Sequence, residues 1–125
     1  MKNQKLDNYL CELGWLANSE YREDTLFGAI EDYTSLLTDM SNYIHDELIN
    51  NKVSVTEVKR ETKRAFKEKA KALHKRVNSK WGANIFLSLS NDPKATVSDL
   101  FDILLDLMIK AEQSGETIQY YVSSC

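Results

Sequence analysis

Hydrophobic positions recur at helical spacing in four separate segments of the chain. In residues 5–17 and again in residues 22–50, apolar side chains return at steps of three and four, the pattern of one buried helix face. At 100° per residue, the apolar positions of the second segment span only about 80°. They are Leu26, Ile30, Tyr33, Leu37, Met40, Ile44 and Leu48. So narrow a seam is typical of a helix that packs along another helix, as in a bundle.

A third helix is predicted for residues 55–81 by signals at both of its ends. Ser54, followed three residues later by Glu57, has the spacing of a capping box, and Gly82 is placed to end the helix. On a helical projection the apolar residues of this segment fall on one side. They are Val58, Ala65, Phe66, Ala70, Ala72, Leu73, Val77 and Trp81. We expect this side to hold the helix to the rest of the bundle.

A fourth helix, residues 97–113, is the most apolar of the set. The stretch from Thr96 to Asp99 carries a start signal, and Ser114 with Gly115 carries a stop signal. Apolar residues cover about two thirds of its circumference. The remaining polar strip contains Asp99, Asp102, Asp106 and Lys110. The pattern predicts that this helix is central in the bundle, or that it also forms a homodimer interface.

Together the segments predict an all-α fold in a single domain over residues 1–125. The fold is a compact bundle of four main helices, at about 5–17, 22–50, 55–81 and 97–113. Four Gly and one Pro in 125 residues agree with this fold class, because turn-rich chains need more of both. Two further stretches alternate apolar and polar residues like strands, which leaves open a short two-stranded addition. These stretches are 84–90 and 117–122.

Charge is strongly segregated along this acidic chain. The formal net charge is −3, yet ten of the sixteen Lys and Arg residues lie between Lys59 and Lys80. Ten basic against three acidic residues give segment 57–80 a charge of +7, which leaves −10 on the rest. On the projection of helix 55–81, seven residues fall within about 120° opposite the apolar side, and we call them the basic face. They are Arg60, Lys63, Arg64, Lys67, Lys71, His74 and Lys75.

The basic face is expected to be exposed and to lie beyond the reach of the Asp residues of the second and fourth helices. It predicts binding to an acidic protein surface, because complementary charge speeds encounter and fixes register. The basic face could instead have no partner and serve only to keep the protein soluble. Membrane binding is not expected, since the apolar side is rich in Ala and no apolar run approaches the roughly 18 residues of a membrane span.

Nucleic acid is the alternative partner, because the same cations could contact phosphates. Against it, the rest of the chain carries −10, and Asn78 alone adds a base-reading amide to the basic side. The sequence contains no helix-turn-helix, zinc-finger or RNP pattern. These observations favour a protein partner over nucleic acid.

Catalytic and cofactor motifs are missing from the sequence, which predicts no enzyme and no cofactor. His45 and His74 complete neither an HExxH nor an ExxH pattern. Asp99, Asp102 and Asp106 share one side of a helix, but a metal ion usually needs ligands from other elements as well. We therefore predict no metal site.

The cysteines and the first residues of the chain indicate in which cellular compartment the protein is expected. Cys11 and Cys125 lie 114 positions apart without a CxxC pair, so neither a zinc site nor a redox motif is predicted. The best apolar run near the start, YLCELGWLA, is short and interrupted by Glu12, unlike a secretory signal. We expect a reduced, soluble, cytoplasmic protein. Its predicted role is that of a small non-enzymatic interaction protein of the inhibitor, immunity factor or regulator type.

Overall fold

The described fold is built from helices alone. A computed structural model describes residue 6 and residues 8–11, 24–81 and 94–115. Its elements are α2 (Asp24–His45), the π-helical turn η1 (Asp46–Asn50), α3 (Val55–Trp81) and α4 (Val97–Gln113). No strand occurs among these described residues, which confirms the all-α fold class.

Most predicted helix limits agree with the structure. The segments 55–81 and 97–113 match α3 and α4, and the predicted helix 22–50 corresponds to α2 continued by η1. Of the predicted helix 5–17, residues 6 and 8–11 are helical, and we call these residues the N-terminal segment. The remainder of that helix lies outside the described residues. So does the suggested two-stranded addition, 84–90 with 117–122.

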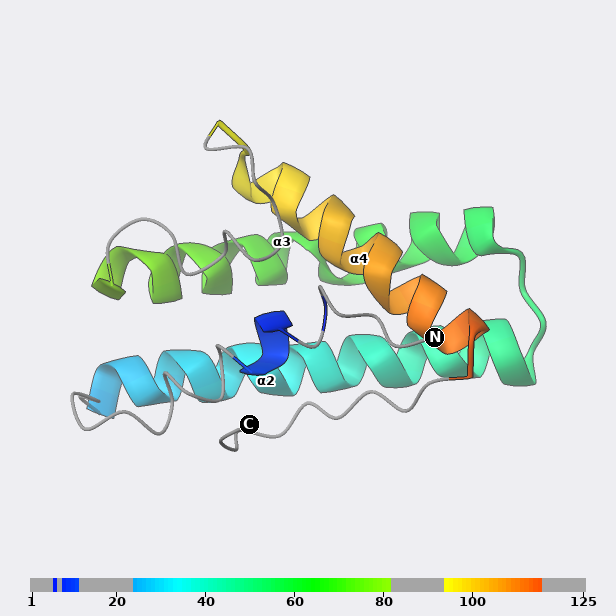
Figure 1. The fold of residues 1–125 in the computed structure, drawn as a ribbon, viewed down its shortest axis with the longest axis horizontal. Coiled ribbons are helices and arrows are strands. Elements are labelled where there is room, and N and C mark those ends of the chain that lie inside the picture. The colour runs from blue at the N-terminus through cyan, green and yellow to red at the C-terminus, as the bar shows by residue number, and fades with distance from the viewer. Residues whose placement is uncertain (1–5, 7, 12–23, 82–93, 116–125) are drawn as a thin grey trace.

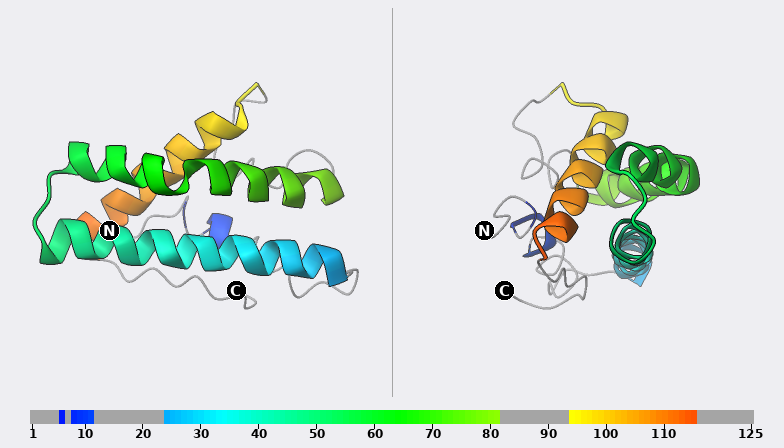
Figure 2. Two further views of the ribbon diagram at one scale, coloured as in Figure 1. Left: turned by 180° about the vertical axis from the view of Figure 1, so that it is seen from behind. Right: turned by 90° about the vertical axis from the view of Figure 1, so that its right-hand side faces the viewer.

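Two of the three long helices, α2 and α3, form a hairpin, and the third, α4, crosses it. α2 and α3 run antiparallel and lie side by side, and α4 crosses them obliquely (Figures 1 and 2). The first turns of α4 pass α3, and its last turns approach the end of α2 (Figure 1). Consequently one face of α4 meets two helices at different points along its length.

The core lies where α2, α3 and α4 meet. The seam predicted for α2 is confirmed at Tyr33, Leu37, Met40 and Ile44, all of which are fully buried. Opposite them α4 contributes five buried apolar side chains: Phe101, Leu104, Leu105, Met108 and Ile109. Burial of this kind supplies the main favourable free energy of folding.

Local hydrogen bonds set the start and end of α4. Thr96 and Asp99 form a complete capping box, with the Asp99 N–H donating to Thr96 Oγ1 (3.1 Å) and the Thr96 N–H donating to Asp99 Oδ2 (3.0 Å). These hydrogen bonds hold the pKa of Asp99 below its usual value. At the other end Gly115 takes a positive φ of 75°, a conformation that favours glycine.

The cap of α3 is simpler than predicted. The Glu57 N–H donates to Ser54 Oγ at 3.3 Å, which is one half of a capping box. The Glu57 carboxylate accepts a hydrogen bond from Arg60 at 3.2 Å. Glu57 therefore contributes to the surface of α3 as well as to its first turn.

Candidate functional site

The predicted basic face is divided by the fold into exposed, partly covered and buried residues. The side chains of Arg60 and Arg64 are 70% and 79% exposed, and Lys75 is also exposed. Those of Lys67 and Lys71 are only 24% and 28% exposed. Lys63, at 43%, is exposed as well, so the basic face keeps four exposed residues, whereas Lys67 and Lys71 are largely covered.

His74 is wrongly assigned to the basic face. It is buried, at 1% exposure, whereas Ala65 and Ala72 of the predicted apolar side are exposed. The buried positions of α3 follow a row of four-residue steps, which turns by about 40° per step around the helix. This row is Val58, Thr62, Ala70 and His74, with Phe66 partly buried between them. The buried face therefore rotates along α3, and its far end reaches His74.

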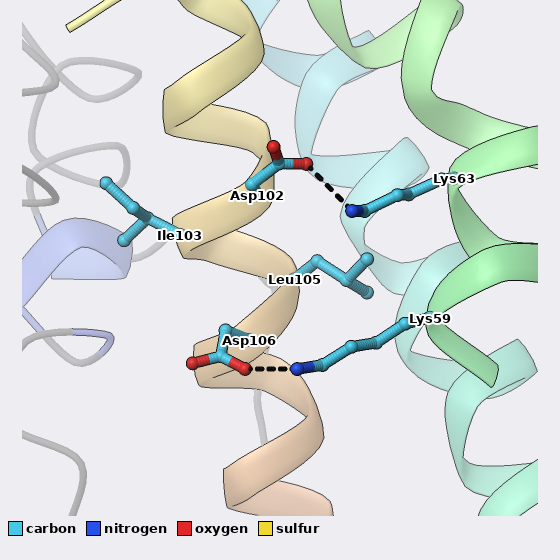
Figure 3. A pocket seen from close by; sticks show the side chains of 6 residues that line it. All are labelled: Lys59, Lys63, Asp102, Ile103, Leu105 and Asp106. Carbon is cyan, nitrogen blue, oxygen red and sulfur yellow. Dashed lines mark ion pairs between the residues drawn. The ribbon is translucent and has the colours of Figure 1, made fainter. Parts of the chain in front are cut away.

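Three lysines of α3 pair with two aspartates of α4, and we call this set the α3–α4 ladder. The distances are 2.9 Å for Lys59–Asp106, 3.6 Å for Lys63–Asp102 and 3.5 Å for Lys67–Asp102. Two of these pairs are drawn in Figure 3. The expectation that the aspartates of the fourth helix cannot neutralise the basic face is therefore wrong. Because α4 crosses α3, its polar strip lies beside the lysines.

The ladder is partly open to solvent, so its individual pairs are weak. The side chains of Lys59 and Asp106 are each 40% exposed, and such pairs typically contribute about 0.2–1 kcal/mol. Lys59, and then Lys110, lower the pKa of Asp106 by hydrogen bonding and charge. The Lys67 ammonium also lies 6.0 Å from the centre of the Phe101 ring, at the limit of a cation–π contact.

An open pocket of about 390 Å³ lies within the ladder. Buried Leu105 and partly buried Ile103 supply its apolar lining. In Figure 3 Leu105 lies between the two charged pairs, whereas Ile103 points away from the lysines. The charged residues are Lys59, Lys63, Asp102 and Asp106. Each of these charges already has an opposite charge within 4 Å, so the pocket offers a ligand no uncompensated charge. Among the described residues, no group of three or more His, Cys, Asp or Glu side chains could hold a metal ion.

The arginines of the basic face pair with glutamates of their own helix. Arg60 lies 3.2 Å from Glu57, and Arg64 Nε donates to Glu61 at 3.0 Å. Pairs three residues apart on an exposed helix contribute only a few tenths of a kcal/mol, about 0.2–0.5. The two guanidinium groups consequently stay available for exchange with carboxylates of another molecule.

A buried polar cluster, which the sequence patterns did not reveal, contains Tyr9, Tyr33 and His74. All three are at most 1% exposed. His74 Nε2 lies 2.9 Å from Tyr9 Oη, and Tyr33 Oη contacts both of these atoms. The rings meet edge to face with centroids 4.6–6.5 Å apart. Burial lowers the pKa of His74 to about 3 and raises that of Tyr33, so both groups are neutral at pH 7.

A second polar contact, also absent from the sequence patterns, ties the end of α4 to α2. The buried Glu112 carboxylate accepts a hydrogen bond from Ser41 Oγ at 3.3 Å and lies 2.9 Å from His45 Nδ1. The carboxylate stands between the hydroxyl and the imidazole, so His45 is not placed to activate Ser41 as a nucleophile. We interpret these three residues as a clamp between two helices.

Cys11 is bonded in a disulfide and is not a free thiol. Its partner lies outside the described residues, because Cys11 is the one cysteine within them. The expectation of reduced cysteines is therefore wrong at Cys11.

Comparison with known proteins gives no relative for this chain. No protein-family model, curated protein or solved structure matches it significantly. Among the described residues, no helix combines the length and apolar composition needed to cross a membrane.

Proposed function

We propose that this chain is a small non-enzymatic interaction protein, of the inhibitor, immunity factor or regulator type, that binds an acidic protein surface through α3. The observation that carries the proposal is the exposure of Arg60 and Arg64, which lie one helical turn apart. We further propose that the fold is a single-domain bundle of four helices, with the N-terminal segment as part of the first.

Arginine suits the proposed contact for a chemical reason. A planar guanidinium can hold a carboxylate through two parallel hydrogen bonds, and arginine is enriched among residues that dominate interface energies. Arg60 and Arg64 stand on a rigid helix, so a partner need not order their backbone. Their glutamates, Glu57 and Glu61, can in turn meet basic groups at the rim of such an interface.

The mixed charge of this surface supports a protein partner over a phosphate polymer. Asp102 and Asp106 lie among the lysines of the ladder, where they would repel a phosphate backbone. A folded protein can place both signs of charge opposite such a pattern. Nucleic acid remains the second candidate, because Lys69 and Lys75 are exposed and form no ion pair with another described residue.

The test is affinity capture from a lysate of the source organism, with the Arg60→Gln/Arg64→Gln double variant beside the natural sequence. We choose glutamine because glutamate would stand next to Glu57 and Glu61 and would disturb the helix by repulsion. The proposal requires that the natural chain retains a protein partner after nuclease treatment and that the double variant loses it. Circular dichroism should show equal helix content in both.

A matched control separates the two candidate functions. The variant Lys69→Gln/Lys75→Gln removes two exposed cations that are not part of the proposed arginine contact. It should retain the protein partner. If it loses binding and the arginine variant does not, or if nuclease removes everything captured, nucleic acid becomes the better assignment. Equal capture by all three chains would contradict any role for α3.

Location and assembly complete the proposal. A cytoplasmic location stays a prediction, and the disulfide at Cys11 counts against it, because the cytosol keeps most thiols reduced. A homodimer also stays a prediction. The partly buried apolar residues of α4 that could pack against a second copy are Leu100, Ile103 and Leu107. Light scattering across protein concentrations distinguishes monomer from dimer.

A further inference from the structure

A second pocket, of about 130 Å³, lies where α2 and η1 turn into α3, and we call it the hairpin pocket. Its apolar lining is Tyr43, Val53 and Val58, and its charged lining is Glu47, Glu57 and Glu61. Sites for small molecules usually measure about 300–1,000 Å³. The hairpin pocket is therefore better matched in size to a single side chain than to a free ligand.

The lining of the hairpin pocket contains three carboxylates and neither a lysine nor an arginine. The two arginines of the proposed contact pair with Glu57 and Glu61 from outside the lining. Glu47 accepts a hydrogen bond from Asn51 Nδ2 at 3.2 Å and forms no ion pair within the described part of the chain. Three carboxylates against two guanidinium groups leave one negative charge at this pocket, whereas the charges in the pocket of the ladder balance.

Tyr43 lies in the negative field of this pocket. Partial burial, and then the charges of the three glutamates, raise the pKa of Tyr43, an effect that Arg64 opposes. The phenol is consequently neutral at pH 7. A field that disfavours a phenolate favours a cation at the same place.

The walls of the hairpin pocket are held in place by contacts within the protein. The Val53 N–H donates to the carbonyl of Glu47 at 2.8 Å, which fixes the turn against η1. The Tyr43 ring packs edge to face on Phe66, with centroids 5.8 Å apart. Val58 is 1% exposed and belongs to the core. A partner does not have to order these walls, which lowers the entropic cost of binding.

We propose that the hairpin pocket receives a lysine side chain of the protein partner, beside the carboxylates that Arg60 and Arg64 bind, an inference that rests on the proposed function. The apolar stem of a lysine can lie along Tyr43, Val53 and Val58. Its ammonium has three donors, which suits carboxylates that come from two elements. The planar guanidinium of arginine is instead matched to the two oxygens of one carboxylate.

A metal ion fits the hairpin pocket less well than an ammonium group. The three glutamates are not grouped closely enough to hold a metal ion. Metal ions such as calcium and magnesium are held by oxygen ligands and water, and they gain nothing from an apolar wall. The combination of apolar and acidic lining therefore favours a long side chain that ends in a positive charge.

The pocket and the arginines are coupled through the glutamates that they share. In the free protein Arg60 pairs with Glu57, and Arg64 pairs with Glu61. A partner carboxylate that takes over a guanidinium leaves its glutamate without that cation, in the lining of the pocket. A lysine in the pocket compensates this charge by direct attraction. The partner is therefore expected to carry a lysine next to its carboxylates, and not carboxylates alone.

NMR titration of the full chain with Nα-acetyl-lysine methylamide tests the pocket before the partner is known. At low salt the amide signals of Glu47, Val53 and Val58 should shift saturably, while those of Leu104 and Leu105 in α4 should stay constant. The Nε-acetylated form of the same probe keeps the stem without the charge and should cause no such shifts. Equal shifts with both probes, or none with lysine, overturn the inference. Displacement of the lysine probe by calcium chloride, but not by sodium chloride of equal ionic strength, would assign the pocket to a metal ion instead.

Glu47→Gln and Asp46→Asn form a matched pair of variants within η1. Each removes one negative charge, and each natural carboxylate accepts a hydrogen bond from the asparagine four residues later. Of the two, Glu47 lines the pocket and Asp46 does not. Glu47→Gln should weaken the lysine probe by about three-fold, as for the loss of one partly exposed ion pair, and Asp46→Asn should leave it nearly unchanged. Equal weakening would indicate general attraction to a negative surface and would refute the site.

Affinity capture with the same pair separates this inference from the proposed function. Glu47→Gln should lower recovery of the partner whose capture depends on Arg60 and Arg64, and Asp46→Asn should not. If the arginine double variant loses the partner while Glu47→Gln retains it fully, the proposed function stands and the lysine contact is refuted. If the lysine probe binds as expected but the arginine variant retains its partner, the pocket stands and the arginine contact is wrong.

Discussion

Reversing the charge of Lys67 should destabilise the protein, although this residue belongs to the predicted basic face. Its ammonium lies 3.5 Å from Asp102 Oδ1 and 6.0 Å from the centre of the Phe101 ring, and only 24% of the side chain is exposed. In Lys67→Glu a carboxylate would face Asp102 across the same gap. The substitution therefore removes an attraction and adds a repulsion.

The magnitude can be worked out from the separation and the exposure. At 3.5 Å, two unit charges interact by about 1 kcal/mol in water and by about 5 kcal/mol at an effective dielectric constant of 20. Solvent screening of this partly exposed pair reduces the attraction to about 1 kcal/mol or less. Lys67→Gln should thus lower the free energy of unfolding by about 1 kcal/mol, and Lys67→Glu by about 2 kcal/mol.

The assay is urea unfolding followed by circular dichroism at low salt and in 1 M NaCl. At 1 M the screening length is about 3 Å, so the difference between Lys67→Glu and Lys67→Gln should shrink. Lys75→Glu is the matched control, because Lys75 is exposed and forms no ion pair with another described residue; its stability should equal that of the natural chain. Adding Asp102→Lys to Lys67→Glu should restore most of the loss.

Two results would refute this reasoning. If Lys67→Glu and Lys75→Glu unfold at the same urea concentration at low salt, the ladder does not stabilise the packing of α4 on α3. If the charge swap at positions 67 and 102 is as unstable as Lys67→Glu alone, the two side chains do not interact directly.

Further predictions concern the cap, the core and the disulfide. Thr96→Ala removes the side-chain half of the α4 capping box and should cost about 1 kcal/mol in urea unfolding, with Ser98→Ala as an unaffected control. Leu104→Ala empties a fully buried position and should cost about 3 kcal/mol, clearly more than Leu100→Ala, whose side chain is only partly buried. Alkylation of the unfolded chain without reductant should leave Cys11 unmodified by mass spectrometry, and modification of Cys11 would contradict the disulfide.

The sequence predicted those features of the fold that depend on local spacing. The buried face of α2 could be predicted from apolar spacing because it points in one direction along the helix, as the burial of Tyr33, Leu37 and Ile44 shows. The starts of α3 and α4 could be predicted from the sequence because each cap uses two residues three positions apart, such as Thr96 and Asp99. These signals do not require knowledge of which helices meet.

The basic face was mispredicted because a helical projection assumes a buried side of constant direction. α3 instead buries a row that turns around the helix, so Thr62 and His74 enter the core while Ala65 stays outside. The ladder was missed for a related reason. Lys67 and Asp102 are 35 positions apart, and only the crossing of α4 over α3 brings them together. No spacing within either helix carries that information.

Polar contacts join α4 to its two neighbours, and they differ in their response to the solvent. In its first half and middle the helix is joined to α3 by ion pairs that water and salt can reach, whereas near its end the buried Glu112 is joined to α2. Raising the ionic strength weakens the first attachment and leaves the second largely intact. At high salt α4 is therefore held in the bundle mainly by its buried apolar side chains, such as Phe101 and Leu105, while the Glu112 contact still joins its C-terminal end to α2.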